Sequence, residues 1–155
     1  MKNEIKNEGI KITGHIRMDF FNIITRKHTI IEKDNLVTTI GKESIAHGIR
    51  GNTARGFITY CALGTNAIAP ALGNIKLGTE IIRKLISVRN TTNNIANFET
   101  FFTTAEGNGS LKEAGLFGDD ASAVADSGIL FCHAAINRVK TINDTLSLVW
   151  TIAIG

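Results

Sequence analysis

Cysteine is scarce in this sequence of 155 residues, and no pattern of metal ligands accompanies it. The two cysteines, Cys61 and Cys132, each lie inside an apolar run, with no second cysteine or histidine at metal-binding spacing. The four histidines are also scattered, and none forms a close cluster with carboxylates or cysteine. We therefore expect two buried thiols, for which a disulfide stays possible, and neither a metal nor another cofactor.

Long apolar runs are also absent. No segment approaches the length of a membrane span, and the first residues, Met1, Lys2, Asn3, Glu4, Ile5, Lys6, Asn7 and Glu8, lack the apolar core of a secretion signal. We expect a protein without a signal peptide, made in the cytoplasm of the cell that produces it, and with no membrane partner.

Clusters of positive charge are missing as well. The net charge is +3, but lysine and arginine are adjacent only at Arg26-Lys27 and Arg83-Lys84. A nucleic-acid-binding surface normally gathers its basic residues on one face, so no nucleic acid is expected as a partner. The mean hydropathy of +0.08 leaves apolar surface that either a well-filled core or a partner subunit would cover.

Catalytic patterns are not present either. There is no phosphate-binding loop and no Gly-x-Ser-x-Gly, and the glutamates are dispersed. Cys132 and His133 are neighbours in a predicted strand, so their side chains diverge, although Cys61 with His133 stays geometrically open. The aspartates of the segment 118–128 are expected in a solvated loop rather than a calcium site. The sequence predicts a protein that is not an enzyme.

What the sequence does contain is alternation with period two. From Ile10 to Phe20, and again from Leu146 to Ile154, apolar and polar residues alternate, which indicates half-buried strands. The predicted structural core comprises Ile16, Met18, Phe20, Leu148, Trp150 and Ile152.

Further strands are expected over the apolar segments 28–33, 57–63, 80–91, 95–104, 111–117 and 129–136, with Asp34-Asn35 ending the first hairpin. The only helix is expected from Thr38 or Thr39 to Ile49, because a threonine can cap its start and Gly51 follows its end. Seven or eight strands and one short helix predict a mainly β fold, an antiparallel β-sandwich or a jelly-roll-like barrel.

One domain is expected over residues 9–155, preceded by an arm at residues 1–8. Alone, the arm cannot bury enough surface to offset the entropy of ordering it. It is therefore the predicted partner-binding segment, added as a strand to the sheet edge of a neighbour.

Several sequence blocks together resemble a group of small structural proteins of tailed bacteriophages, described as tail-fibre, tail-collar or capsid-associated proteins. These blocks are the segments 35–42, 58–65, 69–71 with 77–80, 108–117 and 146–152. The resemblance implies a component of the virion, with no catalytic residues.

The leading hypothesis is a capsid decoration or cement protein, because the chain shows neither a repetitive nor a coiled shaft. The alternative is a tail-fibre, collar or baseplate component, and a carbohydrate-binding module for host attachment ranks below both. The expected partners are other virion proteins, the major capsid protein or tail and collar proteins, together with further copies in a dimer or trimer.

Overall fold

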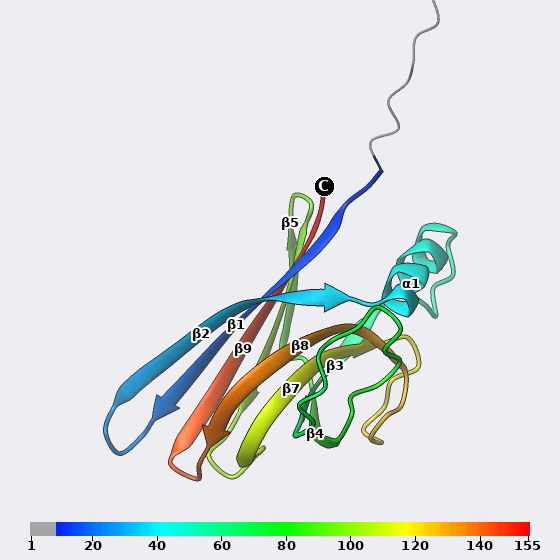
Figure 1. The fold of residues 1–155 in the computed structure, drawn as a ribbon. Helices are drawn as coiled ribbons and strands as arrows, with labels where there is room; N and C mark the ends of the chain where they lie inside the picture. The colour runs from blue at the N-terminus through cyan, green and yellow to red at the C-terminus, as the bar shows by residue number, and fades with distance from the viewer. Residues whose placement is uncertain (1–8) are drawn as a thin grey trace, which may run out of the picture.

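The computed structural model describes residues 9–155, so the predicted arm, residues 1–8, lies outside the described part. The described chain forms nine strands and one helix (Figure 1). In chain order these are β1 (Ile12–Asn22), β2 (Lys27–Val37), α1 (Thr39–Ile49), β3 (Ile58–Gly64), β4 (Glu80–Leu85), β5 (Val88–Thr92), β6 (Ile95–Phe102), β7 (Gly109–Gly118), β8 (Ile129–Lys140) and β9 (Asp144–Ile154).

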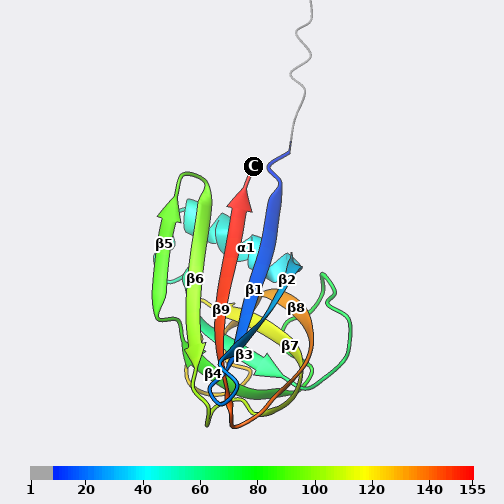
Figure 2. The same ribbon diagram turned by 90° about the vertical axis from the view of Figure 1, so that its left-hand side faces the viewer.

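The expectation of a mainly β, antiparallel fold with one short helix is confirmed. All strands belong to one curled sheet in the order β4-β3-β7-β8-β2-β1-β9-β6-β5, and all pairings are antiparallel. Its two halves face each other across the core, as the two sheets of a sandwich do (Figures 1 and 2).

Strand β2 joins the two halves and is longer than predicted. The hairpin with β1 ends at Asp34-Asn35, as expected, because residues 27–35 of β2 pair with β1, but the strand then continues so that Leu36 and Val37 pair with β8. Gly14 of β1 lies opposite Asn35 at this transfer, and a Cβ at position 14 would overlap the Asn35 amide. The missing side chain makes room for the Asn35 amide where β2 passes from one half to the other.

The segment 80–91 also differs from the prediction, because it forms two strands rather than one. Ile86 donates its N–H to Thr59 in one half, and the next residue, Ser87, donates to Glu99 in the other. β4 and β5 are therefore neighbours in sequence but lie at opposite ends of the sheet order. The curled sheet brings its two edges together at this connection.

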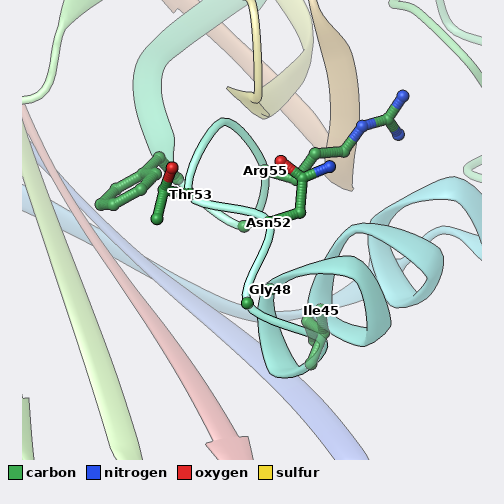
Figure 3. A pocket seen from close by; sticks show the side chains of 8 residues that line it. Ile45, Gly48, Asn52, Thr53 and Arg55 are labelled. Atoms are coloured by element: carbon green, nitrogen blue, oxygen red, sulfur yellow. The ribbon is translucent and has the colours of Figure 1, made fainter.

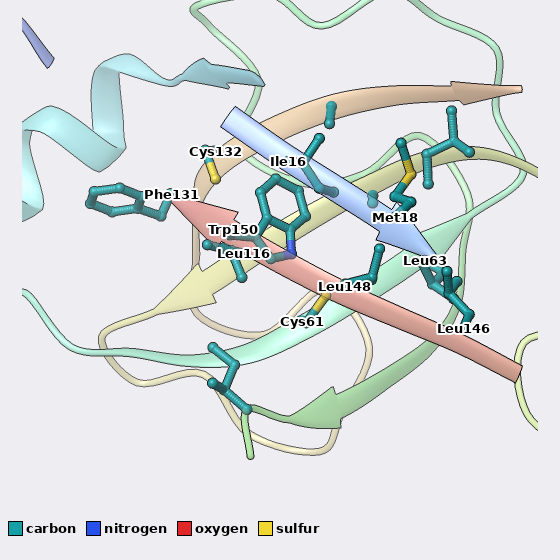
Figure 4. Packing of buried hydrophobic residues seen from close by; sticks show 14 of the residues in the cluster. Ile16, Met18, Cys61, Leu63, Leu116, Phe131, Cys132, Leu146, Leu148 and Trp150 are labelled. Carbon is teal, nitrogen blue, oxygen red and sulfur yellow. The ribbon is translucent and has the colours of Figure 1, made fainter. Parts of the chain in front are cut away.

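The core fills the space between the two halves (Figure 4). The inward rows of β1 and β9 pair directly, Ile16 with Trp150 and Met18 with Leu148. All six residues of the predicted core, Ile16, Met18, Phe20, Leu148, Trp150 and Ile152, are buried.

Helix α1 begins where the sequence predicts. The Thr38 hydroxyl accepts the N–H of Gly41 at 3.0 Å and donates to the carbonyl of Leu130 at 2.6 Å, so one residue both caps the helix and fixes it to β8. A Cβ at Gly41 would overlap the carbonyl oxygen of Phe131, so only glycine permits this close approach.

Candidate functional site: loops fixed by buried charges

The buried charged groups of the described chain share one role, which is to fix loops and turns to the sheet. Three long loops are held in this way: residues 50–57 after α1, residues 65–79 between β3 and β4, and residues 119–128 between β7 and β8. Together with α1 they lie on one side of the sheet half that contains β3, β7 and β8 (Figure 1).

Glu113 of β7 holds the loop 65–79. Its carboxylate is fully buried and accepts the backbone N–H groups of Asn66, Gly78 and Thr79 at 3.3, 2.9 and 2.8 Å. Gly64 makes room for this arrangement, because a Cβ there would lie 2.5 Å from Glu113 Oε1. The carboxylate thus supplies hydrogen bonds to the backbone at both ends of the loop.

His133 of β8 lies against the same carboxylate. Its Nε2 is 3.1 Å from Glu113 Oε2, and its Nδ1 is 2.9 Å from Asn74 Oδ1, which also accepts the N–H of Ala71. Burial lowers the pKa of His133 below its usual value, while the charge and hydrogen bond of Glu113 act in the opposite direction. One ring nitrogen of His133 faces Glu113 and the other faces Asn74. His133 therefore ties the middle of the loop to the sheet.

The loop 119–128 is held by a buried ion pair at the edge of the sheet. The Arg83 guanidinium contacts both oxygens of Glu80, at 2.6 and 2.7 Å, and donates to the carbonyls of Ser122 and Ser127. It also lies over the ring of Phe117. This loop therefore covers part of β4.

Asp119 performs the same task for the segment 50–57. One of its oxygens accepts from the Ser44 hydroxyl at 2.6 Å and from the N–H of Gly56 at 2.8 Å, and Arg55 lies 3.5 Å from the other. Its side chain is 4% exposed, so the prediction of a fully solvated aspartate loop was wrong at this residue. Between α1 and this segment lies an open hollow of about 380 Å³ (Figure 3).

A fourth cluster stabilises turns at the end of β8. The Lys140 ammonium is buried and donates to the Thr103 carbonyl and the Asn108 amide oxygen, both at 2.9 Å. Burial lowers the pKa of Lys140, and the carboxylates of Asp144 and Glu106 oppose that shift. Asp144 accepts from Thr141 and Asn22, which joins the β8–β9 turn to the end of β1.

The fixed loop 65–79 presents apolar side chains outward. Ile68, Leu72 and Ile75 are 63%, 50% and 64% exposed, although the backbone beneath them is held by Glu113 and by Asn74. Ile68 and Ile75 flank a hollow of about 240 Å³ that reaches Glu113 and His133. Lys76 pairs with Asp126 at 3.2 Å and links this loop to its neighbour. We call Ile68, Leu72 and Ile75 the loop surface.

The sequence analysis did not predict the loop surface, although the sequence contains signals for the residues that hold it in place. Glu113 and His133 are ionisable residues inside otherwise apolar strands, and buried charges require partners. The loop partners, however, are 34 to 47 residues from Glu113 and 59 residues from His133, which no local pattern reveals. The predicted partner-binding residues, Met1 to Glu8, are not part of the described structure.

The sequence left a contact between Cys61 and His133 open, and the structure does not form it. The Cys61 sulfur lies in the core between the sheet halves, whereas the His133 imidazole contacts Glu113 and Asn74. Both cysteines are free thiols. Burial raises the pKa of Cys61 to about 12, although contacts from Trp150 and Thr100 act in the opposite direction, and burial also raises that of Cys132.

We predict that neither thiol reacts in the folded protein. At pH 8 a pKa near 12 leaves a thiolate fraction roughly a thousandfold below that of a free cysteine, and the core excludes the reagent as well. Labelling with a chromogenic disulfide reagent should therefore be slow in buffer and should yield two thiols rapidly in denaturant. Fast labelling of the folded protein would contradict the buried placement.

Within residues 9–155, no three histidine, cysteine, aspartate or glutamate side chains gather closely enough to hold a metal ion. No helix in the same range combines the length and apolarity that crossing a bilayer requires. Comparison with known proteins gives no match for this chain among family models, curated sequences or solved structures.

Proposed function

We propose that this protein is a structural component of a tailed-phage particle, a decoration or cement protein that docks on the capsid and stabilises it. The observation that carries the proposal is the loop surface. Three exposed apolar side chains stand on a loop whose backbone is fixed by a buried carboxylate and histidine. A preordered apolar surface loses little conformational entropy on docking, which suits permanent contact with a shell.

Two of the blocks that resemble phage structural proteins meet at this site. Glu113 belongs to the block 108–117, whereas its backbone donors Gly78 and Thr79 belong to the block 77–80. These two blocks therefore contribute to the fixing of one loop. The role we propose is not enzymatic, and it is supported by the use of both His133 nitrogens and the Glu113 carboxylate in internal contacts.

In this proposal residues 1–8 provide a second attachment, as a strand added to the sheet edge of a neighbouring capsid protein. The base of that segment is well placed for such a role. Lys11 and Gly155 exchange backbone hydrogen bonds of 2.6 and 2.8 Å, which fixes the start of the described chain beside the end of β9.

The test is the occupancy of the protein on particles purified from the cells that produce it, measured by quantitative mass spectrometry of separated heads and tails. We expect the protein in the head fraction. The double variant Ile68→Asp/Ile75→Asp, and separately a chain lacking residues 1–8, should keep the unfolding midpoint of the parent yet be lost from particles in a salt wash. The control Val139→Asp changes a residue that is similarly exposed, at 58%, but lies on β8; its occupancy should be unchanged.

Absence of the protein from all particle fractions would overturn the proposal. Recovery with tails would instead favour the tail-fibre, collar or baseplate alternative. A truncated chain that fails to fold would show that residues 1–8 belong to the subunit's own sheet.

A further inference from the structure

Strand β5 forms an unprotected edge of the sheet. Among residues 9–155 it pairs with β6 on one side only, as the last strand in the sheet order (Figure 2), and all five of its residues are exposed. The opposite edge strand, β4, differs, because Glu80 and Arg83 tie the loop 119–128 to it. Open strand edges are templates for pairing with another chain.

The β5–β6 hairpin determines which backbone groups are available at this edge. Its two-residue turn, Asn93-Asn94, is closed by the pair Thr92 and Ile95. Hydrogen-bonded and non-hydrogen-bonded pairs alternate from that closing pair, so Arg89 and Thr91 direct their N–H and C=O groups away from β6. Two donors and two acceptors therefore point outward.

We propose that β5 is a self-association edge, where a second copy of this chain adds its own β5 antiparallel about a twofold axis at Asn90. This register pairs all five residues: Val88 lies opposite the partner's Thr92, Arg89 opposite the partner's Thr91, and Asn90 opposite its own equivalent. The outward groups of Arg89 and Thr91 then form four backbone hydrogen bonds between the two copies.

The charges of β5 favour this register. Its only ionisable side chain is Arg89, which faces an uncharged threonine in the proposed pairing, whereas a twofold axis at Arg89 would oppose two like charges. The Arg89 guanidinium is also directed back within its own subunit, at 3.4 Å from the Ile58 carbonyl.

The side chains on the outer face of β5 also favour a second copy of this chain as the partner. Asn97 donates to Asn90 at 3.1 Å and accepts from Thr151, so a row of polar side chains runs across the sheet and ends at Asn90. Within residues 9–155 the Asn90 amide N–H groups have no hydrogen-bond partner, and they lie where the twofold axis would pass. The partner's Asn90 oxygen would extend the row across the axis.

Sedimentation velocity over a concentration series of the full chain tests this inference, which is independent of the particle. We expect a reversible dimer. Thr91→Pro removes an outward N–H from each copy, and so two of the four bonds, and should raise the dissociation constant about tenfold or more. Its unfolding midpoint should stay near that of the parent, because the lost N–H does not pair with β6.

A charge pair at the axis tests the register. Asn90→Lys and Asn90→Asp should each weaken the dimer about two- to fivefold, and an equimolar mixture of the two should recover association as a heterodimer. Thr25→Lys, in the exposed β1–β2 turn, adds the same charge elsewhere and should have no effect. A strictly monomeric parent, an unchanged dimer in Thr91→Pro, or a mixture that fails to recover would overturn the proposal.

Discussion

Glu113→Ala is expected to lower the free energy of unfolding by about 3–5 kcal/mol, because it removes the acceptor from a buried cluster of donors. Three loop N–H groups and the buried His133 would lose their common partner, which is itself fully buried. The cost of burying unpaired polar groups, rather than the lost ion pair itself, accounts for this magnitude.

Glu113→Gln provides a graded comparison, since the amide keeps one acceptor oxygen but presents its NH₂ group to neighbours that are themselves donors. Its loss of stability should lie between those of the parent and the alanine variant. Glu43→Ala, at an exposed position on α1, is the matched control and should change stability by less than about 0.5 kcal/mol.

Glu113→Ala should also loosen the loop 65–79 under conditions in which the rest of the domain stays folded. Lys76 lies in the loop that Glu113 fixes, so trypsin should cleave after Lys76 faster in Glu113→Ala than in the parent, under conditions where both remain folded. Equal cleavage rates together with a loss of stability below about 1 kcal/mol would show that Glu113 does not hold the loop.

Trp150→Ala is expected to destabilise the fold by about 3–5 kcal/mol through the cavity it leaves. Trp150 is fully buried on the inner face of β9, where it pairs with Ile16 of β1 and Phe98 of β6 (Figure 4). Its ring therefore connects three adjacent strands with the opposite half of the sheet, and truncation would remove contacts with all of them.

Denaturant unfolding followed by circular dichroism measures this effect, because Trp150 is the only tryptophan and its fluorescence is lost with it. Val149→Ala, one residue away on the outer face of β9, is the matched control and should cost less than about 1 kcal/mol. A comparable loss in both variants would mean that strand propensity, and not the core, determines the result.

The strand pattern was determined by the sequence to a large extent. Alternation alone placed Ile16, Met18 and Trp150 on buried faces, and the threonine before an apolar segment located the start of α1. These predictions were correct because they depend on local properties. Burial of every second residue and capping of a helix by its first residue are both determined by residues a few positions apart.

Tertiary structure alone decided how β2 and the segment 80–91 are divided between the two halves. Asp34-Asn35 marks the end of the hairpin, but nothing in the sequence marks the transfer of β2 to β8, where Gly14, 21 residues earlier, leaves room for the Asn35 amide. The break at Ile86 and Ser87 likewise follows from donors that point to Thr59 in one half and Glu99 in the other.

The position of the loop surface was likewise determined by the tertiary structure. The sequence shows Glu113 and His133 as isolated ionisable residues, and only the curled sheet brings them to Asn74, Gly78 and Thr79. A buried charge must find hydrogen-bond partners, but the partners are selected by chain topology rather than by spacing. The sequence by itself therefore determined the buried rows of β1 and β9, whereas the fold decided which loops the buried charges hold in place.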